Sequence, residues 1–431
     1  MKPYLSVPLA GIAVVGLGAV AAAAAELLPG LLGILAVGAQ LCLVVFVLWP
    51  HVVLPVGIVG GTVASGALAD GHVSLIVAVH AGILATGCLA LLFRRAVVRE
   101  DDRSARTAAD GLMLAVAAFV LIGAVYGLAR GNPSDRVAVA AYEFAVIPSY
   151  FFLATRTLGD SRALSKAAMC YLAGATGLAA AELTVPGRHG GLLSALALPP
   201  LLVAVGRARG WQRAGLVVVA AVAGADVVLA AYRAIWLAAG LALLIMLIRC
   251  TGQVRRTVVT TAACGAVLLP LAVAAVPALQ VRASLVGKEF GQSSGYRLPE
   301  AAIGLHVFGT HPILGAGIGQ VTPGVYLPNF AVTTVGPVYH VFYVMILANA
   351  GLVGLLLILR PLLRAVRIGL AACDDQAVAF VALTCGFVAA AVFAGPADGH
   401  WELGLLPALA LLAGRGAASS AGPRTSQGKS P

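Results

Sequence analysis

The chain has 431 residues, of which 61% are hydrophobic and only 10% are charged, and its formal net charge is +11. Soluble domains carry about 45–50% apolar and about 25% charged residues, so this composition excludes a water-soluble fold. The basic residues are dispersed over short loops, where they orient membrane helices, so the positive charge does not indicate a nucleic-acid partner. The sequence therefore predicts an all-α polytopic membrane protein.

Long apolar runs separated by charged breaks recur from end to end, and a bilayer needs about 20 apolar residues in each spanning helix. They predict about 12–14 transmembrane helices. The first run could be mistaken for a cleavable signal peptide, but it is long and another run follows at once, so we interpret it as a span. The candidate spans lie near residues 5–24, 27–48, 52–69, 73–93, 108–129, 138–155, 167–184, 192–206, 214–231, 234–248, 257–278, 338–359, 376–394 and 401–414.

The loops alternate in basic content. With a cytoplasmic N-terminus, about three quarters of the 28 Lys and Arg residues fall in cytoplasmic segments, as the positive-inside rule requires. Both termini are then cytoplasmic. The high Ala, Gly and Arg content suggests a high-GC bacterial genome, so we expect a multi-pass protein of a bacterial cytoplasmic membrane. Residues 1–415 are expected to form one transmembrane domain, and the Gly-, Ser- and Pro-rich segment 416–431 a disordered tail.

One long extracytoplasmic loop, residues 280–339, interrupts the pattern, and loops of about 60 residues are uncommon unless they are functional. Within it, residues 296–305 read as a short helix with Pro299 in the first turn, which places Arg297 at the helix start. The side chains expected to rest on the membrane domain, because they recur at helical spacing, are Leu298, Ala302 and Leu305.

A glycine-rich segment, residues 311–320, follows this helix. Its alternating glycines would let backbone amides approach an anion closely. No strand-then-helix context accompanies them, so a turn packed against the bilayer is favoured over a phosphate cradle.

Two basic side chains could carry chemistry. His340 stands where the loop enters the next span, and an imidazole with a reference pKa of about 6.5 can take a proton from a hydroxyl near neutral pH. Arg233 stands in a tight outer turn, where its guanidinium can hold phosphate oxygens bidentately. The alternatives are an interfacial imidazole without a chemical role, and an arginine that reaches for lipid phosphates beside Tyr232 and Trp236.

Other polar residues are less specific. Glu143 lies within an apolar run and is expected to face the bundle interior. The outer loop 130–136 could bind substrate or simply be solvated. Asp398, His400 and Glu402 cluster near a helix end, but a metal site there lacks a fourth ligand. The seven cysteines show no disulfide framework or metal-binding spacing, so no metal or cofactor is predicted.

Four features follow one another along the chain: Tyr-Arg-Ala-Ile-Trp around Arg233, Arg297 in the outer loop, His-Pro-Ile-Leu-Gly-Ala-Gly-Ile-Gly from His311, and His340 ahead of Ala-Asn-Ala-Gly-Leu-Val-Gly. Their order and spacing resemble those of the O-antigen ligase and O-antigen polymerase superfamily. The likeness covers mainly residues 225–360. The earlier Tyr-Gly-Leu-Ala-Arg-Gly-Asn segment, which contains Arg130, also looks like one that some members carry. Members often have Ser before the first Arg and Asn after the His, where this chain has Tyr232 and Val341.

The resemblance implies a GT-C-type membrane glycosyltransferase. Such enzymes move a glycan from a polyprenyl diphosphate-linked donor to an acceptor hydroxyl on the extracytoplasmic face, without a metal and with inversion. His340 then matches the base, and Arg233 and Arg297 match the arginines that hold the diphosphate. Tyr232, Arg130 and His311 complete the candidate substrate-binding set.

The acceptor could be a glycan, a lipid or a protein, and membrane lipids surround the enzyme. The alternative is a polytopic transporter or flippase of a lipid-linked glycan or another envelope precursor. Transporters tend to have repeated halves and broken helices near the membrane midplane, and no repeat is visible in this sequence.

Overall fold

The computed structural model describes most of the chain. Its described residues are 41–68, 73–98, 107–159, 161–184, 191–230, 232–277, 279–281, 283–284, 297–327, 330–335, 339–372, 374–393 and 400–420.

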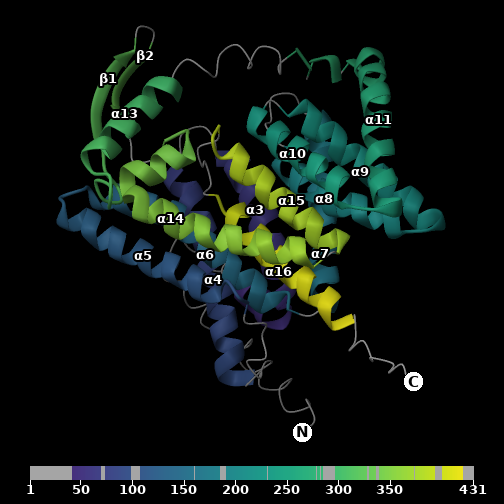
Figure 1. Ribbon diagram of the computed structural model, residues 1–431, viewed down its shortest axis with the longest axis horizontal. Helices are drawn as coiled ribbons and strands as arrows, with labels where there is room; N and C mark the ends of the chain where they lie inside the picture. The colour runs from purple at the N-terminus through teal and green to yellow at the C-terminus, as the bar shows by residue number, and fades with distance from the viewer. Residues whose placement is uncertain are drawn as a thin grey trace, which may run out of the picture. The chain divides into compact units, whose positions relative to one another are not determined.

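The described segments are almost entirely helical (Figure 1). The helices are α3 (Val53–Leu68), α4 (Val73–Phe93), α5 (Asp110–Ala129), α6 (Ser134–Thr157), α7 (Ser161–Thr184), α8 (Leu192–Arg207), α9 (Gly210–Leu229), α10 (Arg233–Arg249), α11 (Gly252–Ala275), α13 (Arg297–Thr310), α14 (Phe342–Ala371), α15 (Asp375–Ala390) and α16 (Glu402–Ser420). Two strands, β1 (Thr322–Leu327) and β2 (Phe330–Val335), pair antiparallel.

Each predicted span from 52–69 onward corresponds to one helix, which confirms an all-α polytopic membrane protein. Among the described residues, five helices are long and apolar enough to cross a bilayer, namely α5, α6, α9, α11 and α14. A sixth span results if the pair Leu41–Leu48 and Pro50–Val63, bent by 117°, counts as one. Helices α8 and α15 are apolar but shorter. The predicted span 5–24 lies outside the described residues.

The chain forms two compact units. The first comprises Met1–Arg106 and Phe152–Gly174, and the second comprises Thr107–Phe151 and Ala175–Pro431. In the first unit, α3 packs on α4. Every predicted site residue belongs to the second unit, which is described from here on.

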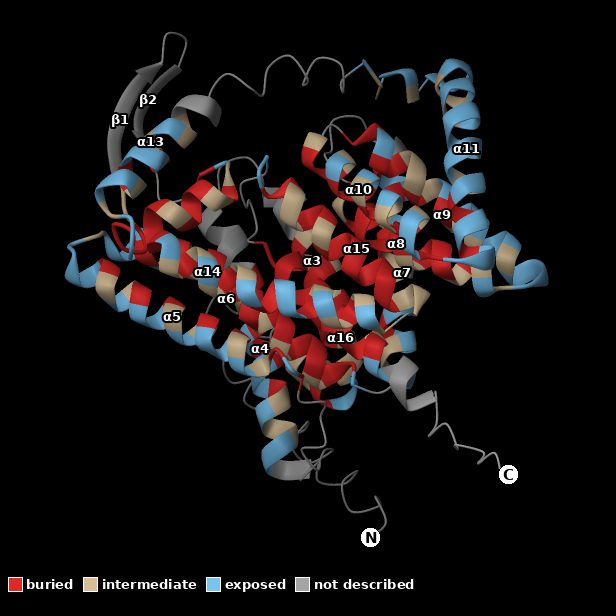
Figure 2. Cartoon of the chain, in the orientation of Figure 1, coloured by how far each residue is buried: buried red, intermediate tan, exposed pale blue. Residues whose placement is uncertain are grey.

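Helices α15 and α16 form the core of the second unit. Helix α15 packs between α10 and α16. Figure 2 shows α15 and α16 mostly buried. A Cβ at Gly386 of α15 would lie 2.3 Å from the Ala238 carbonyl oxygen of α10, so the missing side chain permits the close approach. Helix α11 is mostly exposed, and the large apolar side chains Val267, Leu268 and Leu271 form a surface of the kind that suits contact with lipid.

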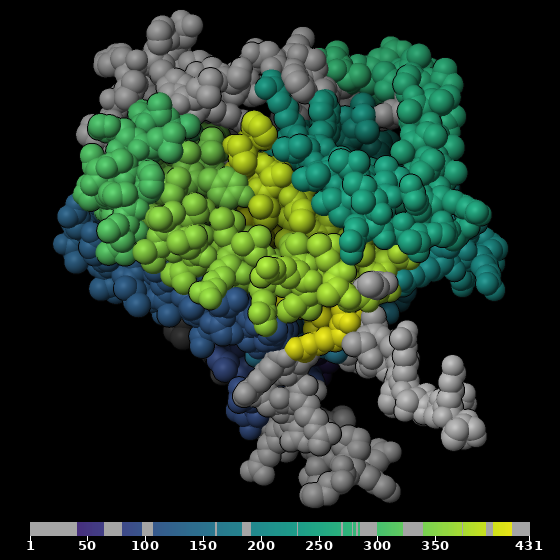
Figure 3. Space-filling view, viewed as in Figure 1, coloured from purple at the N-terminus to yellow at the C-terminus, as the bar shows by residue number. Residues whose placement is uncertain are grey.

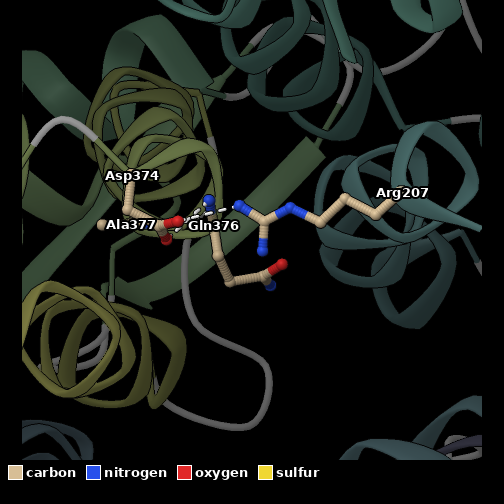
Figure 4. Close-up of polar contacts among 4 residues, drawn as sticks. All are labelled: Arg207, Asp374, Gln376 and Ala377. Carbon is tan, nitrogen blue, oxygen red and sulfur yellow. Dashed lines mark hydrogen bonds and ion pairs between the residues drawn. The ribbon is translucent and has the colours of Figure 1, made fainter. Parts of the chain in front are cut away.

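A polar cluster fixes one end of this core (Figure 4). The Asp374 carboxylate accepts hydrogen bonds from the backbone N–H groups of Gln376 and Ala377, at 3.0 and 3.1 Å, and so caps α15. It also accepts a hydrogen bond of 2.8 Å from Arg207 at the end of α8.

Helix α14 is broken at Gly351, whose φ of 64° lies in the left-handed region that side chains disfavour. A Cβ there would also lie 2.3 Å from the Ile313 carbonyl oxygen. The next amides donate to the glycine-rich segment, Leu352 N–H to Pro312 O at 2.9 Å and Val353 N–H to Ile313 O at 3.2 Å. The loop therefore satisfies the backbone groups that the break exposes.

The long loop of residues 280–339 contains the predicted short helix and an unpredicted hairpin. Helix α13 begins at Arg297, as expected, and continues to Thr310. In the hairpin, Val325 pairs with Val332 and Leu327 with Phe330. At the other end of the chain, α16 continues to Ser420, past residue 416, where the disordered tail was expected to begin.

Candidate functional site

His340 and Glu300 form the clearest polar pair near the start of α14. The Glu300 Oε2 atom accepts a hydrogen bond from the His340 backbone N–H at 2.9 Å and lies 2.8 Å from the imidazole Nδ1. The carboxylate is 15% exposed and the imidazole 47% exposed. The pair therefore fixes the orientation of a ring that remains accessible to a ligand.

Helix α13 packs against the residues around His340 through Gly304. A Cβ at Gly304 would lie 2.2 Å from the Val344 side chain and 2.9 Å from the Tyr339 ring, and Val307 is also buried. In the space-filling view, α13 lies directly against α14 (Figure 3).

The predicted contact face of α13 is wrong. Leu305 is 48% exposed and Ala302 is exposed too, while the side chain of Leu298 lies outside the described residues. The reason is that a small residue allows the closest helix approach, and a large apolar residue in a membrane protein can equally face lipid.

Arg233 lies at the same end of the core as His340. Helices α10 and α15 are antiparallel, because Ala238 near the start of α10 meets Gly386 near the end of α15. At the other end of α10, Arg249 donates to the Leu370 carbonyl in the last turn of α14, which leads into α15. The first residue of α10, Arg233, is therefore near the end of α15. There the Ala391 carbonyl accepts a 3.1 Å hydrogen bond from the Phe342 N–H. Two predicted site residues, far apart in sequence, thus converge on one helix end.

The surroundings of Arg233 also fit a headgroup-level position. Tyr232 occupies the N-cap position of α10 and is 44% exposed, while Arg233 is half-buried. The Trp236 indole donates to the Val227 carbonyl at 2.7 Å, which holds the turn between α9 and α10. Arg297 is placed at the start of α13, and its side chain lies outside the described residues.

Arg130 and His311 form a second, separate polar group. The Arg130 Nη2 atom lies 3.1 Å from His311 Nε2, and the His311 Nδ1 atom lies 2.9 Å from the Thr310 hydroxyl. His311 directly follows α13, whereas Glu300 is near its start. At a rise of about 1.5 Å per residue, the two groups lie about 16 Å apart along this helix. The six predicted residues are therefore not one cluster.

The glycine-rich segment does not cradle an anion through its glycine amides. The N–H of Gly315 donates to His311 O at 3.0 Å, that of Gly317 to Asn349 O at 3.2 Å, and that of Gly319 to the Asn349 side-chain oxygen at 3.1 Å. Asn349 is 1% exposed. Because these donors are all used within the protein, the less favoured phosphate-cradle interpretation is wrong, and the segment is a packing device.

The C-terminal acidic and histidine residues also form a pair. The His400 Nδ1 atom lies 2.5 Å from Glu402 Oε1, both side chains are buried, and the His400 ring packs edge-on against Phe342 at 4.3 Å. Asp398 lies outside the described residues. Across the part of the chain that the structure describes, no three His, Cys, Asp or Glu side chains gather as metal ligands.

Sequence reasoning missed Glu300. It follows Arg297 by three residues on one helix, so both could have been assigned to one face, but its partner is 40 residues away. The buried Glu143, 1% exposed, faces the interior as predicted.

These observations define a polytopic helical membrane protein with His340 and Arg233 at one end of its helical core. Residues 216–359 match the family described as O-Antigen ligase. The match covers about a third of the chain and includes Arg233, Arg297 and His340. With the apolar helices, it supports a membrane enzyme that ligates or polymerises glycans. No curated protein matches the chain.

Proposed function

We propose that this protein is a metal-independent, inverting glycosyltransferase. It moves a glycan from a polyprenyl diphosphate donor to an acceptor hydroxyl at the extracytoplasmic face of a bacterial cytoplasmic membrane. The observation that carries the proposal is that Arg233 and the Glu300-bound His340, both inside the family-matched segment, lie at the end of the core where α15 ends.

The chemistry follows from the residue types. Cleavage of the bond between the anomeric carbon and the diphosphate puts negative charge on the leaving oxygen. Guanidinium groups, which stay charged at all working pH values, stabilise that charge in a partly dehydrated site. We assign this role to Arg233 and Arg297. His340 takes the acceptor proton as the hydroxyl oxygen attacks from the opposite side, so the anomeric configuration inverts.

The charge distribution supports an outward-facing site. The opposite end of the core carries two arginines. Arg207 contacts Asp374 at the start of α15, and Arg249 donates to the Leu370 carbonyl at the end of α14. Basic residues concentrate on the cytoplasmic side of membrane proteins. His340 and Arg233 then face the opposite, extracytoplasmic side.

The second polar group extends the proposed site. A lipid-linked glycan is long, and the group formed by Arg130 and His311, about 16 Å from Glu300 along α13, is suited to contact sugars beyond the reacting one. We assign substrate binding to Arg130, His311 and the exposed Tyr232.

One observation favours the rival function, a transporter or flippase. Helix α14 is broken, as transporter helices often are. In transporters, the freed backbone groups of such a break bind the substrate or ion. Here the amides of Leu352 and Val353 donate to loop carbonyls instead. This use of the break favours a fixed scaffold over a transport site.

A single reconstitution separates the two functions. Purified protein is placed in liposomes with a radiolabelled polyprenyl diphosphate glycan and an acceptor glycan or lipid, with and without a chelator. New glycosidic bonds that form in the presence of chelator would support the proposal. Movement of labelled donor across the bilayer without any new bond would overturn it in favour of the flippase.

A further inference from the structure

We infer that Glu300 is a positioning residue for His340, and that the two side chains act as a carboxylate–imidazole dyad in glycan transfer. The inference rests on the proposed function and deepens it, because it adds a residue that neither the motif order nor the family match assigns.

Glu300 contacts His340 at two points. A single carboxylate oxygen, Oε2, is within 2.9 Å of the His340 backbone nitrogen and 2.8 Å of its Nδ1 atom. The hydrogen bond to the His340 N–H fixes the position of the His340 backbone. The hydrogen bond to Nδ1 fixes the rotation of the imidazole ring. A carboxylate held at two points on the same residue therefore defines the direction of the opposite ring nitrogen, Nε2.

The same bond selects the tautomer. An ionised carboxylate can only accept hydrogen bonds, so the neutral imidazole must carry its proton on Nδ1. The basic lone pair is then on Nε2, the nitrogen that points away from Glu300. In carboxylate–histidine pairs of this kind, the acid holds the ring and stabilises the imidazolium without taking the proton itself.

The proton balance is complete within the dyad and the substrates. The acceptor hydroxyl passes its proton to Nε2 while its oxygen forms the new bond to the anomeric carbon. The bond from that carbon to the diphosphate oxygen breaks, and the diphosphate leaves with the electron pair. The imidazolium that results is balanced by the adjacent Glu300 carboxylate and later returns its proton to water.

The burial pattern agrees with a support role. Glu300 is 15% exposed and His340 is 47% exposed, so the carboxylate is covered while the imidazole can reach a substrate. Glu300 comes from α13, which Gly304 seats tightly on α14, so the carboxylate is held by a packed helix.

The test compares Glu300→Gln, Glu300→Ala and the control His306→Ala, which removes an exposed imidazole from the same helix. The amide of Gln keeps an acceptor oxygen but loses the charge. We expect kcat for glycan transfer to fall about 10–100-fold for Gln and further for Ala, with little change in the donor KM. His306→Ala should keep the native kcat.

A double variant separates positioning from simple folding damage. In a His340→Ala background, Glu300→Ala should lower the residual rate no further, because residues that act as a unit are not additive. The dyad would be overturned if Glu300→Ala lowered the transfer rate by the same factor in the native protein and in His340→Ala, or if Glu300→Ala kept the native kcat. In either case, glycan transfer by the native enzyme would still support the proposed function. A native protein that forms no product would overturn the proposed function and the dyad together.

Discussion

Replacement of Gly315 by Ala tests the account of the broken helix. Gly315 has a φ of 70°, and a Cβ there would meet the backbone of Asn349 and Ala350 at 2.4 and 2.5 Å. A side chain at positive φ costs about 1–2 kcal/mol, and overpacking against backbone costs about 1–3 kcal/mol more. Gly315→Ala should therefore lose about 2–5 kcal/mol of stability.

Gly309 provides the matched control. It lies in α13, and a Cβ there would meet nothing within 4 Å. Ala in place of Gly within a helix gains about 0.5–1 kcal/mol, so Gly309→Ala should be neutral or slightly stabilising. Tm from tryptophan fluorescence in detergent should thus fall for Gly315→Ala and stay equal or rise slightly for Gly309→Ala. Equal Tm values for Gly315→Ala and the native protein would refute the packing role of the loop.

Two further predictions concern the end of the core where α15 begins. Asp374→Ala removes a helix cap worth about 1 kcal/mol as well as an ion pair, whereas Arg207→Ala removes only an exposed pair worth about 0–1 kcal/mol, so Tm should fall more for Asp374→Ala. Equal losses would show that the cap contributes nothing. Burial, with the Asp375 carboxylate adding to it, raises the pKa of the Cys250 thiol from 9.0 to about 12. Its contribution to stability is therefore complete below about pH 9 and is lost as the pH rises toward about 12, since only the unfolded chain releases the proton there. Native Tm should drop more steeply than that of Cys250→Ala between about pH 9 and about pH 11, and parallel curves would contradict this assignment.

The positions of the membrane helices could be predicted from sequence because each is a long apolar run between charged breaks. The core-facing surfaces could not be predicted in the same way. On α13, the sequence pattern favoured the leucine face, whereas Gly304 makes the contact with α14. In a bilayer, both the packed face and the lipid face of a helix are apolar, so hydropathy does not distinguish them.

Long-range backbone pairing was also beyond sequence reasoning. Residues 338–359 read as one continuous span, because nothing local indicates that Gly351 adopts a positive φ. The partners of the break, Pro312 and Ile313, lie about 40 residues earlier in the chain. The β1–β2 hairpin was missed too, although its Val, Thr, Tyr and Phe content is typical of strands.

The candidate site was predicted in part. Local motifs and their order pointed to Arg233, Arg297 and His340, and Arg233 and His340 lie at one end of the core. Glu300 was not predicted, since a carboxylate three residues into a helix reads as an ordinary first-turn acid. Its significance depends on the contact with His340, which only the three-dimensional structure reveals.

The most direct test of the central claim is the rate of glycan transfer by purified His340→Ala protein in liposomes, measured beside its affinity for the polyprenyl diphosphate donor. If His340 is the base, transfer should fall by about 10²–10⁴-fold while donor binding stays at the native level. Transfer at the native rate by His340→Ala would contradict the account.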